Sequence, residues 1–130
     1  MVCLDTNIII DFLKQKKEII EKIENIKKND YEISTTTINT FELFKGISKK
    51  GDTKEIKLLK DFLSHIFVLD FDFKSSIKAA EIFENLRKKG ELIDPLDMQI
   101  ASIVISNNET LLTNNINHFK RIPELKIEKI

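Results

Sequence analysis

MVCLDTNIIID, residues 1–11, is the stretch that decides the fold. Its short apolar run, Val2-Cys3-Leu4, ends abruptly at the carboxylate of Asp5, and Thr6 and Asn7 follow. Such a run predicts a strand that is buried on both faces, and Thr6 or Asn7 can begin a helix. In open α/β sheets, ligands bind beyond the carboxyl ends of the strands. We therefore expect Asp5 to anchor a site to which the fold brings other acidic residues.

The composition indicates one globular domain over residues 1–130, with 42% hydrophobic residues to build a core. Lysine plus arginine equals aspartate plus glutamate, 21 of each, so the net charge is zero. A whole-protein basic field is therefore absent, and any nucleic-acid contact must come from local lysine clusters. Lys49, Lys50, Lys54 and Lys57 form one such cluster, although a solvated helix face explains them equally well.

Cysteine usage and the amino terminus predict a cytoplasmic protein. Cys3 is the only cysteine and lies in the predicted core strand, so a disulfide framework within the chain is impossible. The amino terminus lacks a basic region, and Asp5 and Asp11 interrupt its apolar run, unlike a signal peptide. No stretch approaches the roughly eighteen apolar residues of a membrane span.

Strand and helix patterns alternate along the whole chain. The patterns predict strands over Val2–Leu4, Tyr31–Thr35, Ile66–Asp70, Leu111–Leu112 and Leu125–Ile130, the last at an edge. They predict helices over Ile8–Lys14, 17–28, Ile38–Ser48, 53–64, 73–89 and 95–107, with a short turn around 117–120. Strands that alternate with helices imply right-handed crossovers and a parallel sheet covered on both faces. The expected fold class is α/β, a three-layer α/β/α domain.

Two of the helices carry extended apolar faces. The helix over 73–89 places Ile77, Ala80, Phe83 and Leu86 at helical spacing, which predicts that they face the core. The helix over 95–107 is apolar nearly all round, which is typical of a buried helix.

Three acids, Asp5, Glu42 and Asp97, stand in apolar surroundings. Each has a structural explanation, since Asp5 can cap a helix, Glu42 can be exposed, and Asp97 can complement a helix dipole. Burying a carboxylate is costly, however, unless it is paired or bound to a cation. Together the three acids could form an all-oxygen pocket that suits Mg²⁺ or Mn²⁺.

Other polar residues lie near these acids in the predicted fold. Asp94 is expected to cap the helix that starts at Pro95 and lies one turn from Asp97. Thr113 and Asn115 follow a strand and so fall at the carboxyl edge of the sheet, although they could be plain turn residues. His118 is more often a surface or hydrogen-bonded histidine than a metal ligand. Neither a zinc motif, a phosphate-binding glycine loop nor a Ser-His-Asp set is present.

Four motifs in this order resemble the PIN domain, and most closely the VapC-type toxin ribonucleases. They are LDTNIIID, TTINTFEL with Glu42, PLDMQIAS with Asp97, and LLTNNINHF near the end, and the resemblance extends from residue 2 to about 128. It implies an α/β/α fold with a parallel sheet, a homodimer, an Mg²⁺- or Mn²⁺-dependent endoribonuclease activity on RNA, and inhibition by a small antitoxin.

The resemblance also implies roles for individual residues. Asp5 and Asp97 match the principal metal-binding acids of the family, and Glu42 matches the acid of a motif that begins here at Asn39. Thr113 and Asn115 match the polar residues that order the pocket. Many members carry a further acid in the segment that reads NNINHF here, where this chain offers Asn115 and His118. That departure weakens the case for a second tightly held metal.

The expected reaction is hydrolysis of an RNA phosphodiester, with a metal held by Asp5 and Asp97 and a water oriented by Glu42. Two alternatives stay open. A catalytically inactive PIN-like module could act only by binding protein or RNA, and the missing acid favours it. A haloacid-dehalogenase-like phosphatase also uses a strand-end aspartate, but it shows Asp-x-Asp where this chain has Asn7.

Overall fold

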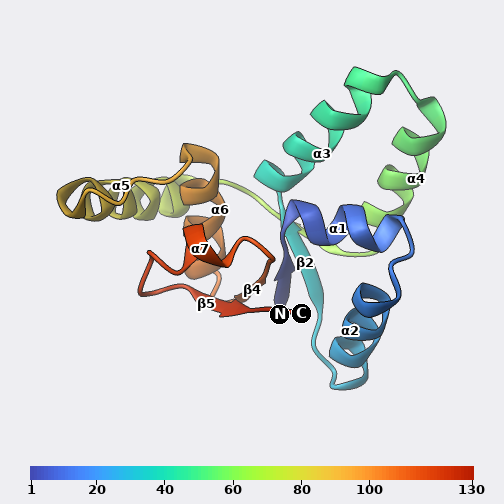
Figure 1. Cartoon of the computed structure of the whole chain (residues 1–130), viewed down its shortest axis with the longest axis horizontal. Coiled ribbons are helices and arrows are strands. Elements are labelled where there is room, and N and C mark those ends of the chain that lie inside the picture. Colours follow the sequence, from blue (N-terminus) through green and yellow to red (C-terminus); the bar gives the residue numbers. More distant parts are fainter.

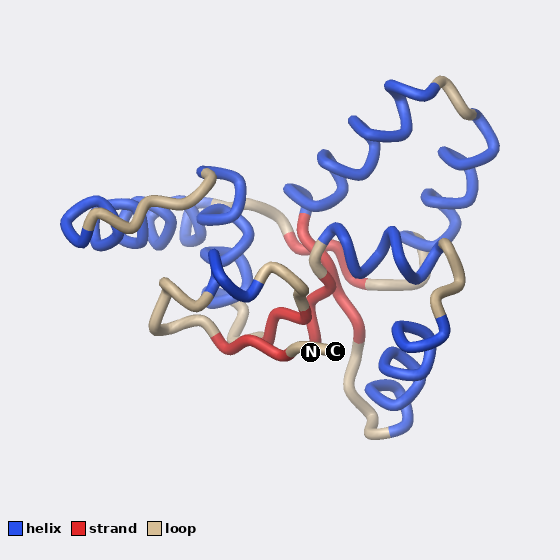
Figure 2. The backbone as a smooth tube through the Cα atoms, in the orientation of Figure 1, coloured by secondary structure: helices blue, strands red, loops and turns tan.

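The computed structural model describes all 130 residues. Its strands are β1 (Val2–Leu4), β2 (Ile33–Thr36), β3 (Phe67–Leu69), β4 (Thr110–Leu112) and β5 (Lys126–Glu128). Its helices are α1 (Thr6–Leu13), α2 (Lys17–Lys28), α3 (Thr37–Lys50), α4 (Thr53–Leu63), α5 (Phe73–Lys89), α6 (Pro95–Ser106) and α7 (Ile116–Phe119). Figure 1 shows the helices around a central sheet, which Figure 2 marks in red.

All five strands run parallel, in the order β3-β2-β1-β4-β5. β1 is therefore central, and it pairs with β2 through Val2 and Cys3 and with β4 through all three of its residues. Parallel strands end at the same edge of a sheet, so the residues that follow β1, β2 and β4 meet there. The predicted parallel sheet and three-layer α/β/α architecture are confirmed, and β5 lies at an edge as expected.

Two apolar clusters cover the two faces of the sheet. Side chains alternate across a strand, so Val2 and Leu4 of β1 point to one face and Cys3 to the other. The first cluster joins Cys3 and Leu111 to buried side chains of α5, α6 and α7. The second joins Val2, Leu4 and Leu112 to α1, α2, α3 and α4.

Most element boundaries lie within two residues of the prediction. α1 begins at Thr6 because Asp5 itself caps the helix: its Oδ1 accepts a hydrogen bond from the Thr6 amide at 2.9 Å. β2 covers Ile33–Thr36, and Tyr31 is exposed outside it. α3 extends to Lys50 and ends at Gly51, which adopts the left-handed conformation (φ +68°) that favours glycine at a helix end.

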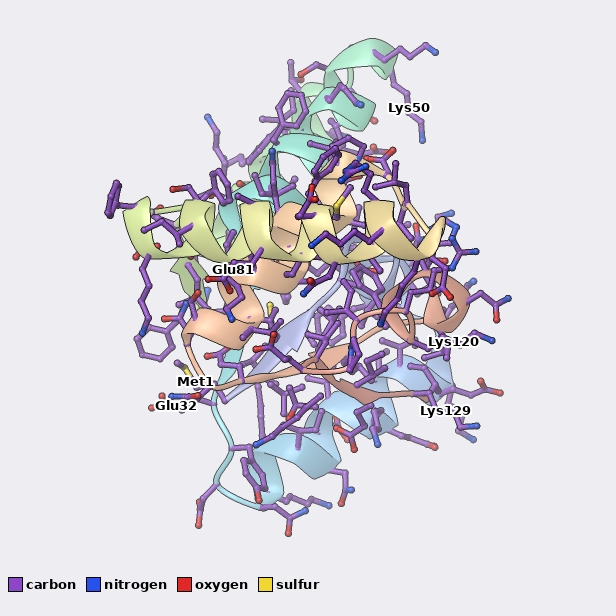
Figure 3. The ribbon with its side chains drawn as sticks, turned by 90° about the vertical axis from the view of Figure 1, so that its left-hand side faces the viewer. Met1, Glu32, Lys50, Glu81, Lys120 and Lys129 are labelled. Atoms are coloured by element: carbon purple, nitrogen blue, oxygen red, sulfur yellow. The ribbon has the colours of Figure 1, made fainter.

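The predicted core face of α5 is wrong for three of its four residues. Leu86 is buried, but Ile77, Ala80 and Phe83 are exposed, with 48% of Ile77 and 45% of Phe83 accessible to solvent. The buried side of the helix is set by Ile82 and Leu86, which contact the cluster built on α6. Helical spacing alone predicted an apolar stripe, and the packing of α5 on α6 decided that much of this stripe faces outward. Figure 3 shows α5 on the outside of the molecule, in front of the other elements.

α6 is buried as predicted, with Ile100, Ala101, Ile103 and Val104 fully inaccessible. A bilayer crossing demands more length and apolar character than any helix of the chain possesses.

One acid that the sequence did not single out lies at the amino edge of the sheet, opposite the carboxyl edge at which Asp5 stands. Glu109 is 3% exposed and accepts a hydrogen bond from the Ser34 hydroxyl at 2.6 Å.

Candidate active site

Asp5 stands at the carboxyl end of the central strand and is only 7% exposed. Its Oδ1 accepts hydrogen bonds from the Thr6 amide at 2.9 Å and from Asn39 Nδ2 at 3.1 Å. Its Oδ2 accepts a hydrogen bond from the Thr113 hydroxyl at 2.7 Å. Residues that follow β1, β2 and β4 thus orient this buried carboxylate.

Asn39 connects the start of α3 to Asp5, and it is fully buried. Thr36 caps α3 in a capping box, because its hydroxyl accepts from the Asn39 amide and Asn39 Oδ1 accepts from the Thr36 amide. With Oδ1 so engaged, Nδ2 is left to donate to Asp5 and to the Thr6 hydroxyl, at 3.1 and 2.9 Å. Through Asn39, the cap of α3 ties the start of this helix to the end of β1, and Figure 1 shows α3 beginning beside the sheet.

Glu42 lies one turn further along α3 and is half-buried. The Thr6 hydroxyl donates to its Oε1 at 2.8 Å, which links Glu42 to Asn39 and Asp5 in one hydrogen-bonded network. Glu42 Oε2 accepts no hydrogen bond from the protein and stays available to a ligand or to water. Thr6 is the site residue that sequence reasoning missed; its position directly after a strand-end acid was the available signal.

Asp97 lies in the first turn of α6, where two residues from the segment after β4 reach it. His118 Nδ1 lies 3.2 Å from Asp97 Oδ2, and Asn115 Nδ2 donates to the same oxygen at 3.5 Å. Asn115 is itself held by Thr113, whose hydroxyl accepts from the Asn115 amide at 2.9 Å. Asn115 and His118 thus both contact Asp97 through Oδ2, and they leave Asp97 Oδ1 free of hydrogen bonds.

The acids are close enough to influence one another's charge. Burial raises the pKa of Glu42, and the negative charges of Asp5 and Asp97 raise it further; the Thr6 hydrogen bond and Lys45 oppose them. Burial likewise raises the pKa of Asp97, a hydrogen bond from His118 lowers it, and the charges of Asp5 and Asp94 raise it. Desolvation and like charge destabilise the ionised acids, a strain that a bound cation would relieve.

Asn7 and Asp94 do not join the network. Asn7 is exposed in the first turn of α1 and makes no hydrogen bond to the three acids. Asp94 caps α6, since its Oδ1 accepts from the Leu96 amide at 2.8 Å, and Pro95 occupies the first turn as predicted. Asp94 therefore acts on Asp97 only through its charge.

The donor set suits a hard divalent cation such as Mg²⁺ or Mn²⁺. Asp5, Glu42 and Asp97 supply carboxylate oxygens, and two of the three keep one oxygen without a hydrogen-bond donor. No group of three acidic, histidine or cysteine side chains lies in an arrangement that could by itself hold a metal ion. Mg²⁺ retains several water ligands and needs only one or two carboxylates, so an open arrangement fits it.

The profile of the PIN domain matches residues 2–125 of this sequence. The chain belongs to the PIN domain family. The structure places Asp5, Glu42 and Asp97 near one another at the carboxyl edge of the sheet, and their role as the metal site of the family stays a prediction.

Curated relatives of this chain resemble it over nearly their full length. The tRNA(fMet)-specific endonuclease VapC of Salmonella typhimurium is 33% identical over 96% of this chain and 94% of its own. Ribonuclease VapC2 of Rickettsia felis is 37% identical over the same shares of the two chains.

Solved structures agree with these comparisons. A chain in the crystal structure of VapBC2 from Rickettsia felis, bound to a DNA fragment from its promoter, has a TM-score of 0.92. It is 36% identical, and the match covers 100% of this PIN domain and 99% of that chain. A chain of DNA-bound VapBC from Salmonella typhimurium has a TM-score of 0.86 at 28% identity, over 98% of this chain and 96% of its own.

Proposed function

We propose that this PIN domain is a metal-dependent endoribonuclease, the toxin of a toxin–antitoxin pair. The observation that carries the proposal is the network that joins Asp5, Asn39, Thr6 and Glu42 at the end of the central strand, with Asp97 beside it. The relatives named as VapC ribonucleases support the same activity. A network that holds acids together against their mutual repulsion is expected where a cation and a phosphodiester bind.

Asp5 and Asp97 would hold Mg²⁺ or Mn²⁺, with Glu42 nearby. When bound, the ion lowers the pKa of a water and neutralises charge on the phosphate. Glu42 orients the attacking water through Oε2 and accepts its proton, while Thr6 holds Oε1. The water oxygen bonds to phosphorus, the bond from phosphorus to one ester oxygen breaks, and that leaving oxygen takes up a proton from the solvent. Asn39 and Thr113 keep Asp5 in place throughout.

The activity is tested by incubating the protein with total RNA and Mn²⁺ or Mg²⁺, with and without EDTA. We expect cleavage that EDTA abolishes and that Asp5→Asn reduces by about a hundredfold or more. Intact RNA under every condition, from a protein whose circular dichroism shows it folded, would favour the alternative of an inactive module that acts by binding.

An apolar groove beside Glu42 is the surface we assign to the antitoxin. It has a volume of about 380 Å³, and α1, α3 and α4 line it with Ile10, Leu13, Leu43, Ile47 and Leu58. Glu42 stands on its lining as well, so a segment lying in the groove would cover an acid of the site. This arrangement would couple partner binding to inhibition. Similar solved structures are VapBC complexes, which supports the proposal of a protein partner.

Leu58 is the residue whose replacement tests this groove. Its side chain is 54% exposed, so replacing it leaves the core intact. Leu58→Glu should weaken binding of the cognate antitoxin at least about tenfold, while RNA cleavage by the free toxin is unchanged. Leu92→Glu, at a 46% exposed leucine outside the groove, is the control. Equal losses in both variants would remove the groove from consideration.

The outward face of α5 and the edge strand β3 are the surface we assign to a homodimer. Phe73 is 81% exposed, Ile77 lies one turn beyond it, and Phe67 and Val68 leave the edge of the sheet apolar. Apolar side chains gathered on consecutive elements are typical of a protein interface.

The lysine cluster Lys49, Lys50, Lys54 and Lys57 is exposed around the connection between α3 and α4. Figure 3 places Lys50 at the far end of this helix pair, on the opposite side of the molecule from Met1 and Glu32. We propose that these lysines contact the RNA backbone. Charge reversal at Lys49 and Lys50 should weaken RNA binding and flatten its salt dependence, and unchanged binding would exclude the cluster.

A further inference from the structure

Phe41 is an exposed aromatic residue one position before Glu42 on α3. Its accessible fraction is 54%, although it lies beside a half-buried acid and within the helix that carries Asn39. The other aromatic residues that are exposed lie outside α3: Tyr31, Phe67, Phe73 and Phe83. Phe41 is therefore the exposed ring on the helix that supplies two residues of the site.

Lys45 lies one turn beyond Phe41 and covers its ring. The Lys45 ammonium nitrogen is 5.4 Å from the ring centroid, within the range of a cation–π contact. Lys45 also acts on the site, because its charge lowers the pKa of Glu42. An aromatic ring, a cation and an acid thus lie together along α3.

We propose that Phe41 stacks on a nucleobase of single-stranded RNA next to the cleaved bond, and that Lys45 contacts a neighbouring phosphate. The inference rests on the proposed ribonuclease function. Single-stranded RNA presents unpaired bases that stack on aromatic side chains, and the charge of a nearby lysine meets the backbone. Stacking accepts every base, so Phe41 positions the strand at the acids without defining its sequence.

A tryptophan probe tests this directly, because the chain contains no tryptophan. In Phe41→Trp, binding of a short single-stranded RNA should quench the tryptophan fluorescence. Rapid mixing records this change before the RNA is cleaved. Tyr31→Trp is the control, since Tyr31 is 58% exposed but precedes β2, at the amino edge of the sheet. Its fluorescence should not change. An oligonucleotide that carries abasic sites at every position should not quench the fluorescence of Phe41→Trp.

Two further variants separate stacking from charge. Phe41→Leu should weaken RNA binding about tenfold and raise KM with little effect on kcat, since stacking acts on binding. Lys45→Gln should reduce the slope of log affinity against log salt by about 0.7. Tyr31→Leu should change neither quantity, and the melting temperatures of all three variants should match the wild type because the side chains are exposed.

The outcomes distinguish this inference from the proposed function. Metal-dependent cleavage without fluorescence quenching in Phe41→Trp, or with a KM unchanged by Phe41→Leu, overturns the role of Phe41 and leaves the ribonuclease intact. Loss of self-association in Phe41→Leu, at unchanged RNA affinity, assigns the ring to a protein interface and also overturns it. Failure of the wild type to bind or cleave any RNA overturns both.

Discussion

Asp94 and Asp97 lie one helical turn apart, and the structure gives them different tasks. Asp94 caps α6 through the Leu96 amide and is exposed, whereas Asp97 is partly buried and contacts His118. Both residues fit the pattern of helix-start acids in the sequence. The difference arises because residues after β4 pack against Asp97 alone.

Asp97→Asn should reduce cleavage about a hundredfold or more and leave the metal-free protein as stable as the wild type, or more stable. The pKa of Asp97 is raised in the fold, so its ionised form opposes folding at neutral pH. Removing the charge removes that opposition. Thermal melting in EDTA measures the stability.

Asp94→Asn is the matched control, because asparagine caps a helix as well as aspartate does. It should change neither cleavage nor the melting temperature appreciably. A metal-free Asp97→Asn protein that melts several degrees below the wild type would show Asp97 to be a structural residue instead.

Thr6→Val keeps the shape of the side chain and removes the hydroxyl between Asn39 and Glu42. The hydrogen bond from Thr6 lowers the pKa of Glu42, so its loss should raise that pKa. If cleavage requires ionised Glu42, activity falls as the pH decreases, and the acidic limb of the pH–rate profile should move to higher pH in Thr6→Val. An unmoved limb in an active variant would exclude Glu42 as the titrating group.

The burial of Glu109 could not be predicted from its residue type or from its neighbours in the sequence. Nothing in its neighbourhood of Asn107 and Asn108 indicates burial, yet it is 3% exposed and its Oε1 has no hydrogen-bond partner. Burial raises the pKa of this carboxyl group. The acid contacts Ser34 of β2, which lies 75 positions away in the sequence, and no local pattern records such a contact.

At the scale of single elements, α3 contributes most to the site. Its capping box orients Asn39, its second turn presents Glu42, and Gly51 sets its end. Gly46 lies within the helix, and a β-carbon there would have no atom within 4 Å, whereas Gly51 ends the helix at φ +68°. The two glycines therefore predict opposite responses to the same substitution.

Gly46→Ala should stabilise the protein by about 0.5–1 kcal/mol, since alanine favours the helix interior. Gly51→Ala should destabilise it by about 1 kcal/mol, because the left-handed conformation disfavours a β-carbon. Chemical denaturation measures the free energy of unfolding of both variants.

Because Gly46 also lines the groove beside Glu42, the stabilised variant Gly46→Ala should bind the antitoxin more weakly. Undiminished binding would contradict the assignment of the groove.

At the scale of the whole molecule, the outward apolar side chains of β3 and α5 predict self-association. Phe73→Glu should convert a dimer to a monomer in light scattering, because it places a charge at the most exposed aromatic residue. Leu92→Glu should leave the dimer intact. A wild-type protein that is monomeric at concentrations of tens of micromolar would contradict the proposed homodimer.

The sequence by itself determined the parallel α/β/α architecture, the buried helix α6 and the expectation that Asp5 stands at a strand end. These follow from short-range patterns: buried strands are continuously apolar, helices repeat every 3.6 residues, and Asp94-Pro95 marks a helix start. The apolar surroundings of Glu42 and Asp97 in the sequence added these two acids to the predicted site, and the family motifs matched the same residues.

Only the tertiary structure decided how these acids are held. Thr6 and Asn39 join Asp5 to Glu42, and His118 contacts Asp97, through hydrogen bonds between residues separated by 21 to 36 positions. Likewise, the packing of α5 on α6 turned Ile77 and Phe83 toward solvent. Periodicity defines which residues share a face, but the direction of that face depends on contacts that only the folded chain makes.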